Sequence, residues 1–200
     1  MKKILFVIAM EKEATDIAKK LNLEQIKNNE EMKVANTIFR RDNISLLLSG
    51  IGKQQTAINL TRYLENNEKP DIIINMGYAG STNCKIGEWV NVSKSYNYEW
   101  YIPGEQQYTV EGFKEDVIKL LNIKTLPCYS AESFVTSTDI KDDVLFDMEL
   151  HSIYMICCTY GIDLISLKKV SDNLNLEDYY KNIDMKDVME LASGLDLLQI

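Results

Sequence analysis

The stretch Ile4-Leu5-Phe6-Val7-Ile8 places five apolar residues in a row near the start of the chain. Such a continuous run, rich in branched side chains, is typical of a strand that helices cover on both faces. Similar runs occur at residues 44–48, 72–74 and 164–167. Because helical patterns separate the runs, the sequence predicts a mainly parallel central sheet.

The helical patterns have apolar residues at spacings of three and four. They cover residues 11–21, 54–64, 148–160 and 186–198, the last with a weak point at Ser193-Gly194. Residues 32–40 and 89–98 are expected to add strands that are partly antiparallel or at an edge. Residues 97–112 are expected to form a long surface loop. We therefore predict an α/β fold in a single domain over residues 1–200, with a mixed, mostly parallel sheet flanked by helices.

Composition limits the classes of function. The chain has 200 residues, 46% of them apolar and 26% charged, which suits a folded domain with its own core. Its net charge of −8 argues against nucleic acid and against anionic membrane surfaces, because no basic stripe is present. The first apolar run is too short to span a bilayer, and charged residues follow it at once. We expect a cytoplasmic protein that binds neither nucleic acid nor membrane.

Cysteine and histidine usage excludes several mechanisms. Cys84, Cys128, Cys157 and Cys158 have no metal-ligand spacing and are expected to be buried and reduced. His151 is the only histidine, so a Ser-His or Cys-His hydrolase or a His-rich zinc site would depend on it alone. We expect His151 to lie on a helix face and the protein to use no metal.

Acids and glycines mark the ends of the predicted strands. Glu13 follows the first strand, Glu149 precedes a helix, and Asp172 closes the last strand. In open α/β sheets ligands bind at the carboxyl ends of the strands. Carboxyl groups that meet there would suit acid–base cleavage of a glycosidic bond. Glycines in Ser49-Gly50-Ile51-Gly52-Lys53 and Gly77-Tyr78-Ala79-Gly80 would let the backbone approach a ligand closely.

Taken in order, five segments resemble the methylthioadenosine/S-adenosylhomocysteine nucleosidases of the purine nucleoside phosphorylase superfamily. The similarity covers nearly the whole chain. The segments are Ala9-Met10-Glu11-Lys12-Glu13, Ser49-Gly50-Ile51-Gly52-Lys53, Ile73-Ile74-Asn75-Met76-Gly77-Tyr78-Ala79-Gly80, Asp147-Met148-Glu149 and Ser171-Asp172.

The resemblance implies a hydrolase that releases adenine from a 5′-thio-substituted adenosine without a metal or organic cofactor. Asp172, preceded by Ser171, matches the acid that protonates purine N7, and Glu13 matches the base that activates water. Glu149 matches the residue that binds the ribose hydroxyls, and Met148 matches the one that packs against the sugar. A raised pKa at a buried strand end would suit the acid.

The resemblance also implies how the rest of a nucleoside would be bound. Ser133-Phe134-Val135, expected to end a strand, matches the segment whose ring stacks on adenine and whose next residue offers backbone hydrogen bonds. Met10 and Ile51 match residues of the pocket for the 5′-substituent. A loop from a second subunit completes that pocket in the family, which implies a homodimer and a role in nucleoside metabolism such as methionine salvage.

Some positions differ from the family pattern. Tyr78 stands where a serine is usual and is expected to crowd the ribose, and Lys168 replaces an arginine near the attacking water. Substrate choice is therefore open. Alternatives are a purine nucleoside phosphorylase, a futalosine-type hydrolase and a nucleoside-binding protein without catalysis. Glu11-Lys12-Glu13 would repel phosphate, and Asn75 replaces a phosphorylase arginine, which favours hydrolysis.

Overall fold

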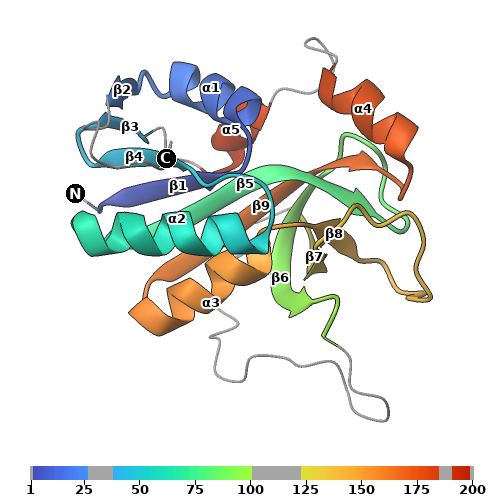
Figure 1. Cartoon of the computed structure of the whole chain (residues 1–200). Helices are drawn as coiled ribbons and strands as arrows, with labels where there is room; N and C mark the ends of the chain where they lie inside the picture. Colours follow the sequence, from blue (N-terminus) through green and yellow to red (C-terminus); the bar gives the residue numbers. More distant parts are fainter. Residues whose placement is uncertain (1, 27–37, 101–122, 185–190, 199–200) are drawn as a thin grey trace.

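The computed structural model describes residues 2–26, 38–100, 123–184 and 191–198, and four parallel strands form the centre of its sheet (Figure 1). β1 (Ile4–Ile8) lies between β4 (Ile44–Leu48) and β5 (Ile72–Ser81), and β5 also pairs with β9 (Asp163–Asp172). The four predicted apolar runs are therefore confirmed as strands. β5 and β9 continue past the apolar runs, and this extension carries the polar residues considered below.

The remaining strands close part of the sheet into a ring. Across the described residues the strand order is β2-β3-β4-β1-β5-β8-β7-β6-β9, and β5 also pairs with β9. β6 (Trp89–Asn97) is antiparallel to β9 and β8 (Leu145–Asp147) is antiparallel to β5, while β7 (Lys124–Ser130) is parallel to both β6 and β8. The expected mixed, mostly parallel sheet is confirmed. Its antiparallel edge is formed by β2 (Glu24–Ile26) and β3 (Ile38–Arg41).

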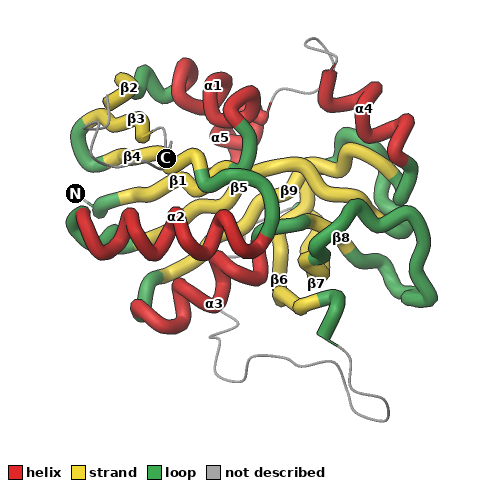
Figure 2. The backbone as a smooth tube through the Cα atoms, in the orientation of Figure 1, coloured by secondary structure: helices red, strands yellow, loops and turns green. Residues whose placement is uncertain are grey.

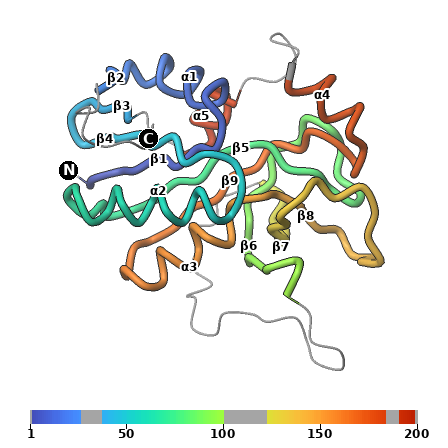
Figure 3. The backbone as a smooth tube through the Cα atoms, in the orientation of Figure 1, coloured from blue at the N-terminus to red at the C-terminus, as the bar shows by residue number. Residues whose placement is uncertain are grey.

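Helices cover both faces of the sheet, as Figure 2 shows. On one face lie α1 (Glu11–Lys20), the 3-10 turn η1 (Leu191–Gly194) and α5 (Leu195–Leu198), which share a core cluster with alternate residues of β1 and β5. On the other face, α2 (Lys53–Asn66) and α3 (Leu150–Tyr160) pack on the opposite side chains of the same strands. α5, near the end of the chain, therefore lies beside α1, near its start (Figure 3).

The structure corrects three expectations about local structure. The described part of the predicted helix 186–198 is divided into η1 and α5 near the expected weak point, Ser193-Gly194. A helix that was not predicted, α4 (Leu176–Asp184), follows β9 directly. Cys158 is exposed on α3, whereas the other three cysteines are buried, because it points away from the face that Cys157 presents to the core.

Two predictions fall largely outside the described residues. The strand predicted at 32–40 is described only from Ile38 onward, where β3 begins. The loop predicted at 97–112 is described only as far as Trp100, and Asn97 is the last residue of β6. Among the helices in the described ranges, none has the length and apolar character needed to cross a membrane.

The central strands are expected to contribute most of the stability. Ile73 is fully buried in β5, so Ile73→Ala should lower the free energy of unfolding by about 2–5 kcal/mol in urea denaturation, through lost burial and a cavity. Ile58→Ala on the exposed face of α2, where the side chain is 58% accessible, should change it by less than about 0.5 kcal/mol. Equal losses in both variants would contradict this view of the core.

Candidate active site

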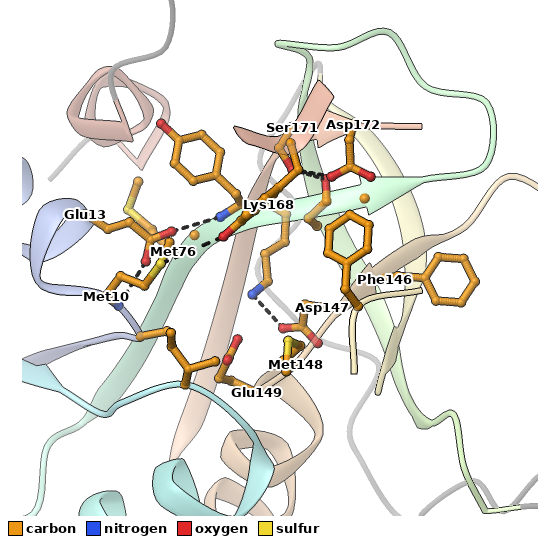
Figure 4. A pocket seen from close by; sticks show the side chains of 18 of the residues that line it. Met10, Glu13, Met76, Phe146, Asp147, Met148, Glu149, Lys168, Ser171 and Asp172 are labelled. Atoms are coloured by element: carbon orange, nitrogen blue, oxygen red, sulfur yellow. Dashed lines mark hydrogen bonds and ion pairs between the residues drawn. The ribbon is translucent and has the colours of Figure 1, made fainter. Parts of the chain in front are cut away.

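A pocket opens at the carboxyl end of β1, beside the continuing strands β5 and β9. Its empty volume is about 610 Å³, part of it open to solvent, which is the size of a small-molecule site. Glu13, Glu149 and Asp172, predicted to meet at the ends of strands, all line it. Figure 4 shows Glu13 and Asp172 on different sides of the pocket. The sequence-based expectation of a shared crevice is therefore confirmed.

Glu13 reaches the pocket from the first turn of α1 and is only 4% exposed. Its carboxylate accepts hydrogen bonds from the backbone amides of Met10 at 3.2 Å and Tyr78 at 3.3 Å. Burial raises the pKa of Glu13 to about 7, while these two amides and the charge of Lys168 act in the opposite direction. Glu13 can therefore exchange a proton near neutral pH.

Asp172 lies at the end of β9, and its side chain is completely buried. The Ser171 hydroxyl donates to one carboxyl oxygen at 2.7 Å, and the backbone amide of Asn175 donates to the other at 3.3 Å. A Cβ on Gly80 of β5 would stand 2.9 Å from this carboxyl group, so the glycine permits the close approach. Burial raises the pKa of Asp172, although the hydrogen bond from Ser171 lowers it in part.

Glu149 precedes α3 and meets the glycine motif that follows β4. The backbone amide of Gly52 donates to the Glu149 carboxylate at 2.8 Å. Burial, and then the nearby charge of Asp147, raise the pKa of Glu149 to about 7. An acceptor held in this way, with one oxygen already bonded, suits a ligand hydroxyl group at the other oxygen.

An ion pair between Lys168 and Asp147 lies among these acids. The Lys168 ammonium group is 2.7 Å from the Asp147 carboxylate, and both side chains are almost completely buried (Figure 4). Asp147 also accepts hydrogen bonds from the Ser130 hydroxyl at 2.5 Å and the Leu150 amide at 3.0 Å. Asp147 was part of a recognised segment, but no role had been predicted for it. Lys168 is 21 residues from Asp147 in the sequence and lies on another strand, so no local pattern indicates the pairing.

Apolar side chains form the wall between the acids. Of the residues expected there, Met10, Ile51, Phe134 and Met148 line the pocket. Tyr179 of α4 joins them: its ring packs edge-on against Phe134 at 5.4 Å, and its hydroxyl lies 3.9 Å from the Met10 sulfur. Tyr179 was not predicted because its helix, α4, was not predicted. The signal was Asn175, whose side chain accepts the amides of the helix start, followed by two acids in the first turn.

Three other expected residues occupy less direct positions. Tyr78 lines the pocket, but its ring packs against the core cluster on the α1 face. Ser133 is exposed and Val135 is half-buried, and neither is among the described residues that line the pocket. The expectation that this segment ends a strand is wrong, since β7 ends at Ser130. The Ala131 amide still bonds to the Asp147 carbonyl of β8, and the next amide, that of Glu132, bonds to the Glu99 carboxylate at 2.5 Å.

Comparison with known proteins identifies the family. The model of the Phosphorylase superfamily matches residues 3–194. The chain belongs to this superfamily. Its curated relatives include the 5′-methylthioadenosine/S-adenosylhomocysteine nucleosidase of Buchnera aphidicola, which is 28% identical over 211 residues, covering 90% of this chain and 89% of the relative. The comparisons bear out the predicted resemblance and the expectation of an N-glycosyl hydrolase.

Solved structures of this superfamily have the same fold. A putative 5′-methylthioadenosine/S-adenosylhomocysteine nucleosidase from Borrelia burgdorferi, bound to adenine, superimposes with a TM-score of 0.81 at 21% identity, covering 98% of this chain and 99% of its own. An Asp-to-Asn variant of the Helicobacter pylori nucleosidase, with 5′-methylthioadenosine in the active site, gives 0.78 at 19% identity, with 100% and 97% coverage. A futalosine hydrolase mutant of the same organism gives 0.76 at 19% identity, with the same coverage. At these identities the similarity shows the fold alone.

The raised pKa of Glu13 has a consequence for stability. Between its ordinary value of 4.5 and about 7, the folded chain keeps a proton that the unfolded chain has released, so stability falls as pH rises through this window. Glu13→Gln removes this cost. We expect its gain in unfolding free energy over the wild type to be about 1–3 kcal/mol larger at pH 8 than at pH 5.5.

Urea denaturation at the two pH values measures this difference. Glu11→Gln, an exposed position in the same helical turn, is the matched control, and its effect should be nearly the same at both pH values. A Glu13→Gln effect that does not change with pH would contradict the assignment.

Proposed function

We propose that this protein hydrolyses the N-glycosidic bond of a 5′-substituted adenosine, either 5′-methylthioadenosine or S-adenosylhomocysteine, and releases adenine. The observation that carries the proposal is the placement of Glu13 and Asp172. Both are buried and both line one pocket, yet they come from α1 and from the end of β9. A nucleoside between them would present its base to one carboxyl group and its sugar to the other.

The two carboxyl groups have complementary tasks in this mechanism. Asp172 donates a proton to purine N7, so that adenine leaves as a neutral base, and burial favours the protonated form that this step needs. Glu13 takes a proton from water as the water attacks the anomeric carbon. Its pKa near 7 lets it act as a base at neutral pH. The sugar becomes cationic in the transition state, and nearby carboxylates stabilise that charge.

Other pocket residues would orient the nucleoside. Glu149 accepts hydrogen bonds from the ribose hydroxyls while the Gly52 amide holds it in place. Phe134 stacks on the purine, and Met148 packs against the sugar. Val135 follows Phe134 but is not among the described residues that line the pocket, so its proposed backbone hydrogen bonds to the base edge require this loop to move toward the nucleoside. Met10, Ile51 and Tyr179 supply apolar surface for a thioether substituent.

Hydrolysis fits the charges of the pocket better than phosphorolysis does. Among the described lining residues the only cationic side chain is Lys168, and Asp147 already neutralises it. Asn75 stands in place of a phosphorylase arginine. Its side-chain nitrogen donates to the Val7 carbonyl, and its side-chain oxygen accepts a hydrogen bond from the Ser166 hydroxyl. A phosphate dianion would meet Glu13 and Glu149, and no described lining residue offers it an unpaired cation.

A futalosine-type substrate is the second candidate, because a futalosine hydrolase structure has the same fold. The apolar wall of Met10, Ile51 and Tyr179 favours the thioether over a charged aryl carboxylate, since no described lining residue offers that group a cation without a partner. The proposal also includes a homodimer, a cytoplasmic location and a role in methionine salvage, as the family resemblance implies.

Removal of either carboxyl group should abolish turnover. Asp172→Asn and Glu13→Gln are each expected to lower adenine release from 5′-methylthioadenosine by about 10²–10⁴-fold, because each removes a proton-transfer step. Both should still bind the nucleoside. Liquid chromatography of the released base, with and without phosphate, measures the effect.

The control is Glu177→Gln, an exposed acid on α4, which should retain full activity. Wild-type rates in both active-site variants would exclude the mechanism. A requirement for phosphate would instead indicate a phosphorylase, and release from futalosine alone would favour the second candidate.

A further inference from the structure

Lys53 is a buried cation that the proposed chemistry does not use. It is the first residue of α2, and only 8% of its surface is exposed. A positive charge in the first turn of a helix is opposed by the helix dipole, and a buried charge is costly unless it is paired. Local sequence preferences therefore do not explain a lysine at this position, and its tertiary contacts must.

Those contacts use the full donor capacity of the ammonium group. Lys53 donates to the Asn97 side chain at 2.7 Å, to the Glu99 carboxylate at 2.6 Å and to the Ser130 carbonyl at 3.2 Å. The Glu132 carboxylate, at 3.5 Å, adds a second negative charge. An ammonium group has three hydrogens, so each of them has an acceptor.

The acceptors belong to the two segments that leave the ring of strands next to the pocket. Asn97 ends β6 and Ser130 ends β7. The Glu99 carboxylate bonds to Lys53 with one oxygen and to the Glu132 amide with the other. Glu132 stands two residues before Phe134, which lines the pocket. Lys53 thus fixes the start of the loop that carries Phe134.

The other side of Lys53 leads to the opposite wall of the same pocket. The amide of the preceding residue, Gly52, holds the Glu149 carboxylate at 2.8 Å, and Ile51 lines the pocket. Lys53 therefore lies between the segment that holds Glu149 and the segment that carries Phe134. In the proposed function Glu149 binds the ribose and Phe134 stacks on the base. The distance between these two walls therefore has to match the distance between the two parts of the nucleoside.

We propose that Lys53 is a positioning residue that holds the Phe134 loop at the correct distance from the Gly52–Glu149 contact, and so sets how tightly the base is bound. The predicted effects on KM and on adenine affinity rest on the proposed function. Among the described residues, Lys53 does not line the pocket and forms no hydrogen bond or ion pair with Asp172 or Glu13. Its loss should therefore weaken binding more than it slows proton transfer.

The test compares Lys53→Met with Lys53→Arg and with Lys124→Met as a matched control. Lys124 also forms an ion pair, at 2.9 Å from the Asp143 carboxylate, but it lies at the other end of β7 and does not line the pocket. We expect Lys53→Met to raise KM for 5′-methylthioadenosine and the dissociation constant of adenine by about tenfold, with kcat lowered less than about threefold. Lys53→Arg, which keeps the charge, should recover most of the loss, and Lys124→Met should change neither constant.

Several results would overturn the inference. The first is a Lys53→Met variant whose KM and dissociation constant of adenine equal those of Lys124→Met. The second is a Lys53→Arg variant whose KM and dissociation constant of adenine are as high as those of Lys53→Met. If Lys53→Met does not fold, Glu99→Gln serves instead, because Glu99 is partly exposed and its two carboxylate oxygens join Lys53 to the Glu132 amide. Glutamine keeps one carbonyl oxygen, so one of these two hydrogen bonds is lost. Glu99→Gln should raise KM in the same direction, and an unchanged KM would refute the role.

A second readout separates this inference from the proposed function. Lys53→Met should speed amide hydrogen exchange in residues 131–135 but not in the central strand β5. If the wild type releases no base from any nucleoside, the proposed function fails, while the exchange pattern still decides whether Lys53 holds the loop. Unchanged exchange in residues 131–135 would overturn it in either case.

Discussion

One buried ammonium group, that of Lys168, lies among three buried carboxyl groups, those of Glu13, Asp147 and Glu149. Of the residues that the structure describes, only Asp147 forms a close ion pair with it. Glu13 and Glu149 therefore remain incompletely neutralised in a site of low polarity, and burial raises the pKa of each to about 7. This arrangement costs stability, and it supplies groups that exchange protons at neutral pH.

The fold makes this arrangement possible by extending two strands. β1 and β4 end at the pocket, whereas β5 and β9 continue along it, so that Gly80 and Asp172 near their ends line its wall. The ring that β5, β8, β7, β6 and β9 form then supplies the other wall, through Asp147 and the loop with Phe134. Asp172 and Glu13, the proposed acid and base, come from parts of the chain far apart in sequence, so the sheet sets their separation.

The sequence predicted much of this structure because the relevant signals are local. Continuous apolar runs and helical spacing were sufficient for the central strands and for α1, α2 and α3. The places of Glu13 and Asp172 at strand ends marked them as candidates, and the resemblance to the nucleosidases supplied their expected roles. The ring closure between β5 and β9 leaves no local pattern, and neither does the Lys168–Asp147 ion pair. Tyr179 was not predicted because its short helix was not predicted. The hydrogen bonds of Lys53 form only where the ends of β6 and β7 meet α2.

The crystal structure of the Asp172→Asn variant with 5′-methylthioadenosine is the most direct test of the account. The account predicts purine N7 within hydrogen-bonding distance of the side chain at position 172, and a water molecule between Glu13 and the anomeric carbon on the face away from the base. A nucleoside with N7 directed away from position 172, or with Glu13 out of reach of that water, would contradict it.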